Sequence, residues 1–273
     1  MLHRDLAFRY GHDARVSGLA YRSWSLWHLG FADQAIQSLD IATAWARKVD
    51  HGNTTGFALV WGVMVANAMM RRAPEVLTTA RLALPILAEL AQPMWYSFAR
   101  VFYGWGLAHE GDFTGALSEI DSGIAGLKAI GTRRWFTLFY DLKAEAHALA
   151  GRGDEAGASI AEASKHLDET GDLACAADLH CVVGHLRSKL DPDTARAAYE
   201  RALEIARAQE SVAMGLCAAT GLARLWRGQG RTKDAHQLLA PVYGRFTEGF
   251  GTPDLMEAKV LLGELDQSAL IDR

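Results

Sequence analysis

Six turn-like clusters recur along the chain at almost constant spacing, and this repeat constrains the fold more than any other feature. A short residue follows each cluster, and the six are Ala35, Val76, Ala116, Ala156, Ala195 and Ala235. Their separations are 41, 40, 40, 39 and 40 residues. A fixed period of this length is typical of solenoid proteins, in which each unit is a helical hairpin that packs on the next.

A second small residue follows seven positions later in most of the repeats. These positions hold Ala42, Ala83, Gly123, Ala163, Ala202 and Val242. Residues seven apart lie two turns apart on one face of a helix, so they allow a second helix to approach closely at both levels. We therefore predict that the small residues are buried where paired helices cross.

The segments around the turns are helical in pattern. Apolar segments precede the turns, and shorter, more polar segments with apolar positions three and four residues apart follow them. No segment shows the sustained period-two alternation of a strand. We predict an all-α, right-handed helical-hairpin solenoid that forms one repeat domain over 1–273. Its six hairpins are expected at about 14–50, 55–91, 94–130, 134–170, 173–209 and 211–249, with a capping helix at 252–266.

Composition excludes several functional classes. The 273 residues are 50% hydrophobic and 22% charged, with a net charge of −4, so there is no basic surplus for binding nucleic acid. The apolar run 56–70 is short for a membrane span, and no signal peptide is visible. Three cysteines without CxxC spacing indicate a reducing compartment, so we expect a cytoplasmic protein. No zinc site is expected, because Cys175, His180, Cys181 and His185 lack ligand spacing.

The turn-plus-alanine pattern resembles the tetratricopeptide repeat (TPR), although the period of forty departs from its 34 residues. The segments "YGHDARVSGLAYRSWSLWHLGFADQAI" and "LLAPVYGRFTEGFGTPDLMEAKVLLGEL" resemble the TPR-like tail of a bacterial protein family. In this family an adenylate or guanylate cyclase domain, or a DNA-binding transcriptional-regulator domain, precedes an AAA-type ATPase domain and the tail. The family usually has proline where this chain has Ala14.

The resemblance implies a regulatory tail whose catalytic domains would lie upstream. No G-x-x-x-x-G-K-[ST] motif is present, so we expect neither phosphate-loop nucleotide binding nor any other cofactor, and no enzymatic activity. The predicted function is a protein-interaction or ligand-sensing scaffold in signal transduction. One alternative is a fragment of a cyclase or ATPase regulator, and a weaker one is a helical hydrolase-like domain.

A concave surface lined by the first helix of each hairpin is the predicted partner site. By the register of the aligned turns, it carries Trp24, Trp27, His28, Trp61, Trp105, His109, Asp141, Glu145, His180, Arg187, Arg224 and Arg227. Aromatic and arginine side chains dominate binding energy at protein interfaces. An acidic peptide with apolar anchors is the expected ligand. The alternative places the tryptophans in the core between hairpins, and Asp141 with Glu145 on a solvated helix face.

Overall fold

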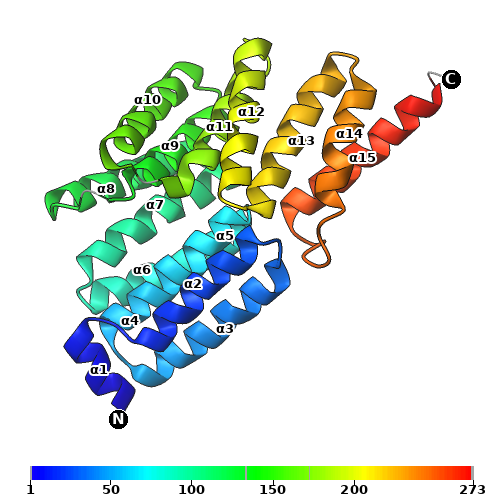
Figure 1. Ribbon diagram of the computed structural model, residues 1–273. Helices are drawn as coiled ribbons and strands as arrows, with labels where there is room; N and C mark the ends of the chain where they lie inside the picture. Colours follow the sequence, from blue (N-terminus) through cyan, green and yellow to red (C-terminus); the bar gives the residue numbers. More distant parts are fainter. Residues whose placement is uncertain (1, 133, 172, 272–273) are drawn as a thin grey trace.

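The structure is a computed structural model that describes residues 2–132, 134–171 and 173–271. Throughout this part of the chain every regular element is a helix, so the predicted all-α class is confirmed. A short helix, α1 (Leu2–Tyr10), precedes six helical hairpins, and a last helix, α15 (Pro253–Ile271), follows them (Figure 1). Neighbouring hairpins pack against one another as a helical-hairpin solenoid.

The six hairpins, numbered in chain order, are each made of a first and a second helix. They are α2 (Ala14–His28) with α3 (Ala32–Val49); α4 (Gly52–Gly56), η1 (Phe57–Met64) and α5 (Val65–Met69) with α6 (Ala73–Glu89); α7 (Pro93–Glu110) with α8 (Phe113–Ala129); α9 (Phe136–Leu149) with α10 (Gly153–Thr170); η2 (Leu173–Cys175) and α11 (Ala176–Arg187) with α12 (Pro192–Ala208); and α13 (Val212–Gly228) with α14 (Thr232–Tyr243).

The six short residues that follow the turns form what we call the seam, and all are completely buried, as predicted. The helices of hairpin three show how close the approach is. A Cβ atom on Gly123 of α8 would lie 2.6 Å from the carbonyl oxygen of Ser97 in α7. A larger side chain at such a crossing would have to push the two helices apart.

Hairpin two departs from regular helix geometry. The segment η1 is π-helical and lies between two short α-helices, and it carries Phe57 and Trp61 into the core. Such π-helical turns are rare and frequently occur at functional sites. It lies in the apolar run 56–70, which is short for a membrane span. Within the described residues no helix is both long and apolar enough to cross a bilayer.

The solenoid curves until its first hairpin contacts its last. His28 Nδ1 lies 2.7 Å from Ser211 Oγ, which begins hairpin six. Residues of α2 and α3, such as Trp27 and Leu39, share one core cluster with Leu216 of α13. The array therefore closes on itself, and its inner surface surrounds an enclosed space.

The loop between α14 and α15 contributes to this closure. The sixth hairpin is predicted to extend to residue 249, but its second helix already ends at Tyr243. Gly249 has φ +75° and donates its amide hydrogen to Asp33 Oδ2 at 3.1 Å. A Cβ atom at Gly249 would lie 2.8 Å from the Cβ of Ala32. This glycine therefore allows the loop to contact hairpin one.

Candidate ligand-binding chamber

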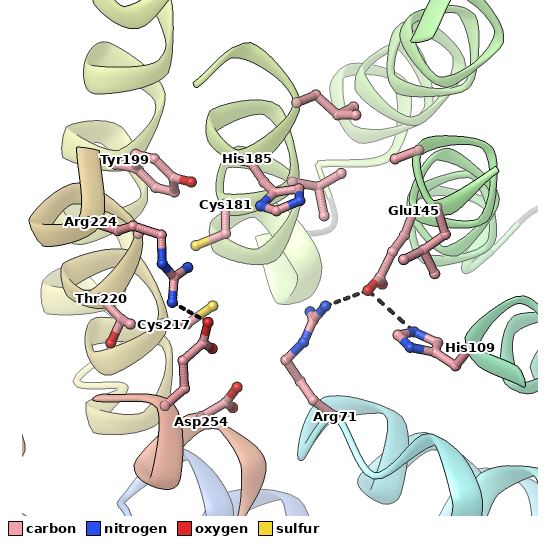
Figure 2. A pocket seen from close by; sticks show the side chains of 16 residues that line it. Arg71, His109, Glu145, Cys181, His185, Tyr199, Cys217, Thr220, Arg224 and Asp254 are labelled. Atoms are coloured by element: carbon pink, nitrogen blue, oxygen red, sulfur yellow. Dashed lines mark hydrogen bonds and ion pairs between the residues drawn. The ribbon is translucent and has the colours of Figure 1, made fainter. Parts of the chain in front are cut away.

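An inner cavity of about 280 Å³, which we call the chamber, opens among hairpins two to six and α15 (Figure 2). Each of these units supplies part of its wall. The lining residues are Arg71, His109, Glu145, Ala148, Leu149, Cys181, Val182, His185, Leu186, Tyr199, Cys217, Thr220, Gly221, Arg224, Asp254 and Glu257. The wall mixes charged groups with apolar surface, which is the usual make-up of a ligand pocket.

A hydrogen-bonded ion pair between Arg71 and Glu145 spans the chamber (Figure 2). The other carboxylate oxygen of Glu145 accepts a hydrogen bond from Trp105 Nε1 at 2.9 Å. His109 Nε2 lies 3.4 Å from Glu145 Oε1. Burial by itself would raise the pKa of Glu145, but Arg71 and then His109 and Trp105 outweigh it and lower this pKa to about 2. Glu145 is therefore ionised and held in place.

The backbone of Arg71 has an unusual conformation for its residue type. Its φ is +57°, in the left-handed region, whereas the corresponding turns of hairpins one and three have Gly30 and Gly111. A non-glycine residue there costs about 1–2 kcal/mol. The ion pair with Glu145 accounts for an arginine at this position, because the turn aims its side chain into the chamber.

Three further carboxyl groups gather around the same arginine. Asp141 is 2% exposed, and burial, followed by Asp178 and Glu145, raises its pKa well above the usual range. Burial also raises the pKa of Asp178, and it raises that of Asp254 to about 7. Arg71 opposes each of these shifts, but one guanidinium does not balance four carboxyl groups. Burial therefore favours the protonated form of the three aspartates, and a cation bound beside them would favour their ionised form instead.

A smaller cavity of about 70 Å³ adjoins the chamber and shares Arg71, Cys217 and Asp254 with it. We call it the tryptophan recess, because four indole side chains line it. Its main lining residues are Trp24, Trp27, Trp61, Trp135, Asp178 and Asp254. Trp135 has φ +74°, and its ring centroid lies 4.2 Å from that of Trp61. Four indole rings and two carboxyl groups therefore line one small cavity.

The structure brings many of the predicted site residues together. His109, Glu145 and Arg224 line the chamber. Trp24, Trp27, His28 and Trp61 line the recess. Trp105 contacts the chamber only through its indole N–H, since the residue is 1% exposed. That these residues bind a partner stays a prediction.

Trp27, Trp61 and Trp105 also belong to the hydrophobic core. They are 6%, 3% and 1% exposed, so they do not form an open aromatic groove. Asp141 and Glu145 do not form a solvated face, since Asp141 is buried and the side chain of Glu145 is 13% exposed.

The phase of α11 also differs from the prediction. Its inner face carries Asp178, Cys181 and His185, which are three or four residues apart and share a stripe. His180 and Arg187 are each two positions away from a member of this stripe, and neither lines the chamber or the recess. A step of two residues turns the side chain to about the opposite side of a helix.

The two arginines predicted for the sixth hairpin's part of the concave surface already form ion pairs within the protein. Arg224 forms an ion pair with Glu257, and Arg227 forms one with Glu264. Both glutamates belong to α15, so the capping helix neutralises these arginines. An acidic ligand would have to displace those carboxylates.

Four important residues of the site were missed, namely Arg71, Trp135, Asp178 and Asp254. A sequence pattern was available for Arg71, which stands five residues before its seam residue, where hairpins one, three, four and six have glycine. For the two aspartates no local pattern exists, because distant hairpins bring them together.

Comparisons with known proteins support the repeat architecture. A Rap protein complexed with Competence and Sporulation Factor has a TM-score of 0.62 at 15% identity, covering 95% of this chain and 77% of that one. A Signal Transduction ATPase with Numerous Domains from Pyrococcus horikoshii, with a tetratricopeptide repeat sensor, has a TM-score of 0.50 at 13% identity, covering 93% of this chain and 38% of that one. The fold is therefore that of TPR-like repeat proteins.

Comparisons of sequence give less information about this chain than comparisons of structure. No known protein-family profile matches the chain. It is 26% identical to an uncharacterized protein, R02095, of Rhizobium meliloti (strain 1021) over 207 residues. These residues are 75% of this chain but 20% of that protein, so the chain corresponds to one fifth of a much longer relative.

Proposed function

We propose that the chain is a non-catalytic, ligand-sensing scaffold whose chamber binds a peptide segment of a protein partner. The observation that carries the proposal is the make-up of the chamber wall. Side chains from Arg71 in hairpin two to Asp254 in α15 converge on one space of about 280 Å³. A ligand there contacts hairpins that are remote in sequence.

Such a ligand has a physical means of acting on the whole array. A ligand shifts a conformational equilibrium by its differential affinity for the two states. In a solenoid each hairpin contacts mainly its neighbours, so small changes of angle between hairpins add up along the array. The contact of hairpin one with hairpin six, made in part by His28 and Ser211, rests on that curvature. Binding in the chamber would therefore stabilise the closed form.

We further propose that this sensing serves a bacterial signalling protein in the cytoplasm. The resemblance of both end segments to tails that follow cyclase, transcriptional-regulator and ATPase domains supports this role. So does the match to a fifth of a longer protein. A repeat domain that senses a ligand beside an output domain would use the closure of the solenoid as its output. The alternative is a fragment of a cyclase or ATPase regulator whose activity lies in other domains.

The test selects peptides and then blocks the chamber. Peptides from a displayed random library are selected on the purified chain, and their affinities are measured by calorimetry. Leu149 lines the chamber and is 43% exposed, so Leu149→Trp should fill the opening and weaken binding by at least about tenfold, or about 1.4 kcal/mol.

Leu82→Trp is the matched control, because Leu82 is 65% exposed on α6 and lines neither the chamber nor the recess. The control should bind the selected peptides like the wild type. Peptides that bind Leu149→Trp as tightly as the wild type would place the binding surface outside the chamber.

A further inference from the structure

The tryptophan recess has the features of a site for a small organic cation. The ring centroid of Trp61 lies 4.5 Å from that of Trp24 and 4.2 Å from that of Trp135. Indole faces attract cations through their quadrupole, and the attraction is strongest where water is excluded. Asp178 and Asp254 line the same recess. Aromatic faces and carboxylates together favour a positively charged group.

The charges around the recess support the same conclusion. Within the described residues, neither Asp178 nor Asp254 is within ion-pair distance of a basic side chain. The guanidinium of Arg71, which lines the same recess, is held by Glu145. A cation from a ligand would supply the positive counter-charge that these two carboxyl groups lack when they are ionised. His28 also lines the recess, but burial lowers its pKa, so the imidazole does not supply this charge near neutral pH.

The indole N–H groups narrow the chemistry further. Trp61 is 3% exposed, and its Nε1 has no hydrogen-bond acceptor in the described part of the protein; the same holds for Trp24 Nε1. A buried donor without an acceptor is costly, and an acceptor on a ligand bound in the recess would satisfy it. A lysine or arginine side chain offers a cation without an acceptor beside it. A peptide N-terminus offers an ammonium group with its own carbonyl oxygen close by.

Size agrees with this choice. The recess holds about 70 Å³, which suits a terminal ammonium group and one small residue, whereas the adjoining chamber of about 280 Å³ has room for the residues that follow. The two spaces share Arg71, Cys217 and Asp254, so a chain leaving the recess enters the chamber directly.

We propose that the tryptophan recess binds the free N-terminal ammonium group of the peptide held in the chamber, an inference that rests on the function proposed above. Asp178 and Asp254 accept its N–H hydrogens, the indole faces of Trp24 and Trp135 surround it, and Trp61 Nε1 donates to the first carbonyl oxygen. The ligand therefore enters with its N-terminus first.

The first test uses glycinamide, a small probe with a free ammonium group beside a carbonyl oxygen. The chain is labelled with ¹⁵N at the tryptophan indoles, and the Trp61 signal is assigned with Trp61→Phe. Glycinamide should shift the Trp61 signal in a saturable way, whereas N-acetylglycinamide, which lacks the charge, should not. Equal shifts with both probes, or none with glycinamide, would overturn the inference without bearing on peptide binding elsewhere in the chamber.

The second test uses the selected peptides in free and N-acetylated forms. Acetylation should weaken binding at least about tenfold, because it removes a charge-assisted hydrogen bond. Asp178→Asn and Asp254→Asn should weaken the free peptide similarly, and Trp61→Phe, which removes the N–H, about fivefold. Asp193→Asn is the control, since that side chain is 95% exposed on α12. Full affinity of acetylated peptides would refute the N-terminal site and leave the peptide-binding function standing.

Discussion

The seam and the inner surface are built by the same hairpins, but the residues at the seam positions are alike and those at the inner positions differ. At the seam all six hairpins carry a small residue, completely buried in each case. The position eleven residues before each seam residue varies much more. Hairpins one and three both have tryptophan there, and the other four hairpins have four different residues. In chain order the six residues are Trp24, Val65, Trp105, Glu145, Gly184 and Arg224.

Most of this second set points inward. Trp24 and Val65 line the recess, while Glu145 and Arg224 line the chamber. Repetition at the seam fixes the spacing of the helices, since any larger side chain would separate them. The inner register has no such constraint, so it is free to vary and to carry binding chemistry. The comparison teaches that the site lies where the repeat is broken.

Trp105 is buried in the core, and removing it gives the largest expected effect. Trp105→Ala should cost about 3–5 kcal/mol of unfolding free energy, because it leaves a cavity in the core. It also removes an N–H donor from Glu145. Urea unfolding measures the loss. Trp105→Phe, which keeps a ring but not the N–H, should lose less. An unchanged stability for Trp105→Ala would return this residue to an open groove, as one of the two sequence interpretations had it.

The seam itself can be tested by overpacking. Ala116→Leu and Ala156→Leu should each destabilise the fold by about 1–3 kcal/mol, because the added atoms force paired helices apart. The matched controls are Ala125→Leu on α8 and Ala161→Leu on α10, both exposed positions of the same helices. Thermal and urea unfolding of the four variants should separate the pairs. Equal stability of seam and control variants would mean that the helices are not closely packed at the seam.

The burial of Asp254 in the chamber should make the free energy of unfolding depend on pH. Burial raises the pKa of Asp254 from 3.8 to about 7, with Arg71 opposing and Glu257, Asp178 and Glu145 adding to the rise. The folded state then binds a proton that the unfolded state has released, so stability falls as pH rises from about 4 to 7. Asp254→Asn removes this loss. Since Asp254 is partly exposed, we expect its advantage over the wild type to grow by on the order of 1–2 kcal/mol between pH 5 and pH 8.

Urea unfolding at the two pH values measures this difference, with Asp193→Asn as the exposed control. A constant difference between wild type and Asp254→Asn would show that Asp254 is solvated. The effect of burial on its pKa would then be smaller than the structure indicates.

The sequence was enough to predict the frame. The period of forty and the small residues at the seam follow from a local requirement, since two helices of a hairpin must pack closely and each hairpin must bury a face against the next. Part of the inner surface was predictable for the same reason, because the register that places Ala116 and Ala156 at the seam places Trp105 and Glu145 inward.

The tertiary structure alone decided the rest of the site. Arg71, Asp178 and Asp254 come from hairpin two, hairpin five and the capping helix, and no local pattern relates them. They meet because small rotations between successive hairpins add up until hairpin one contacts hairpin six. The helical phase of α11, the burial of Asp141 and the pairing of Arg224 with α15 depend on the same curvature. Periodic burial is a property of each hairpin, whereas the enclosed space and its charges are properties of the whole array.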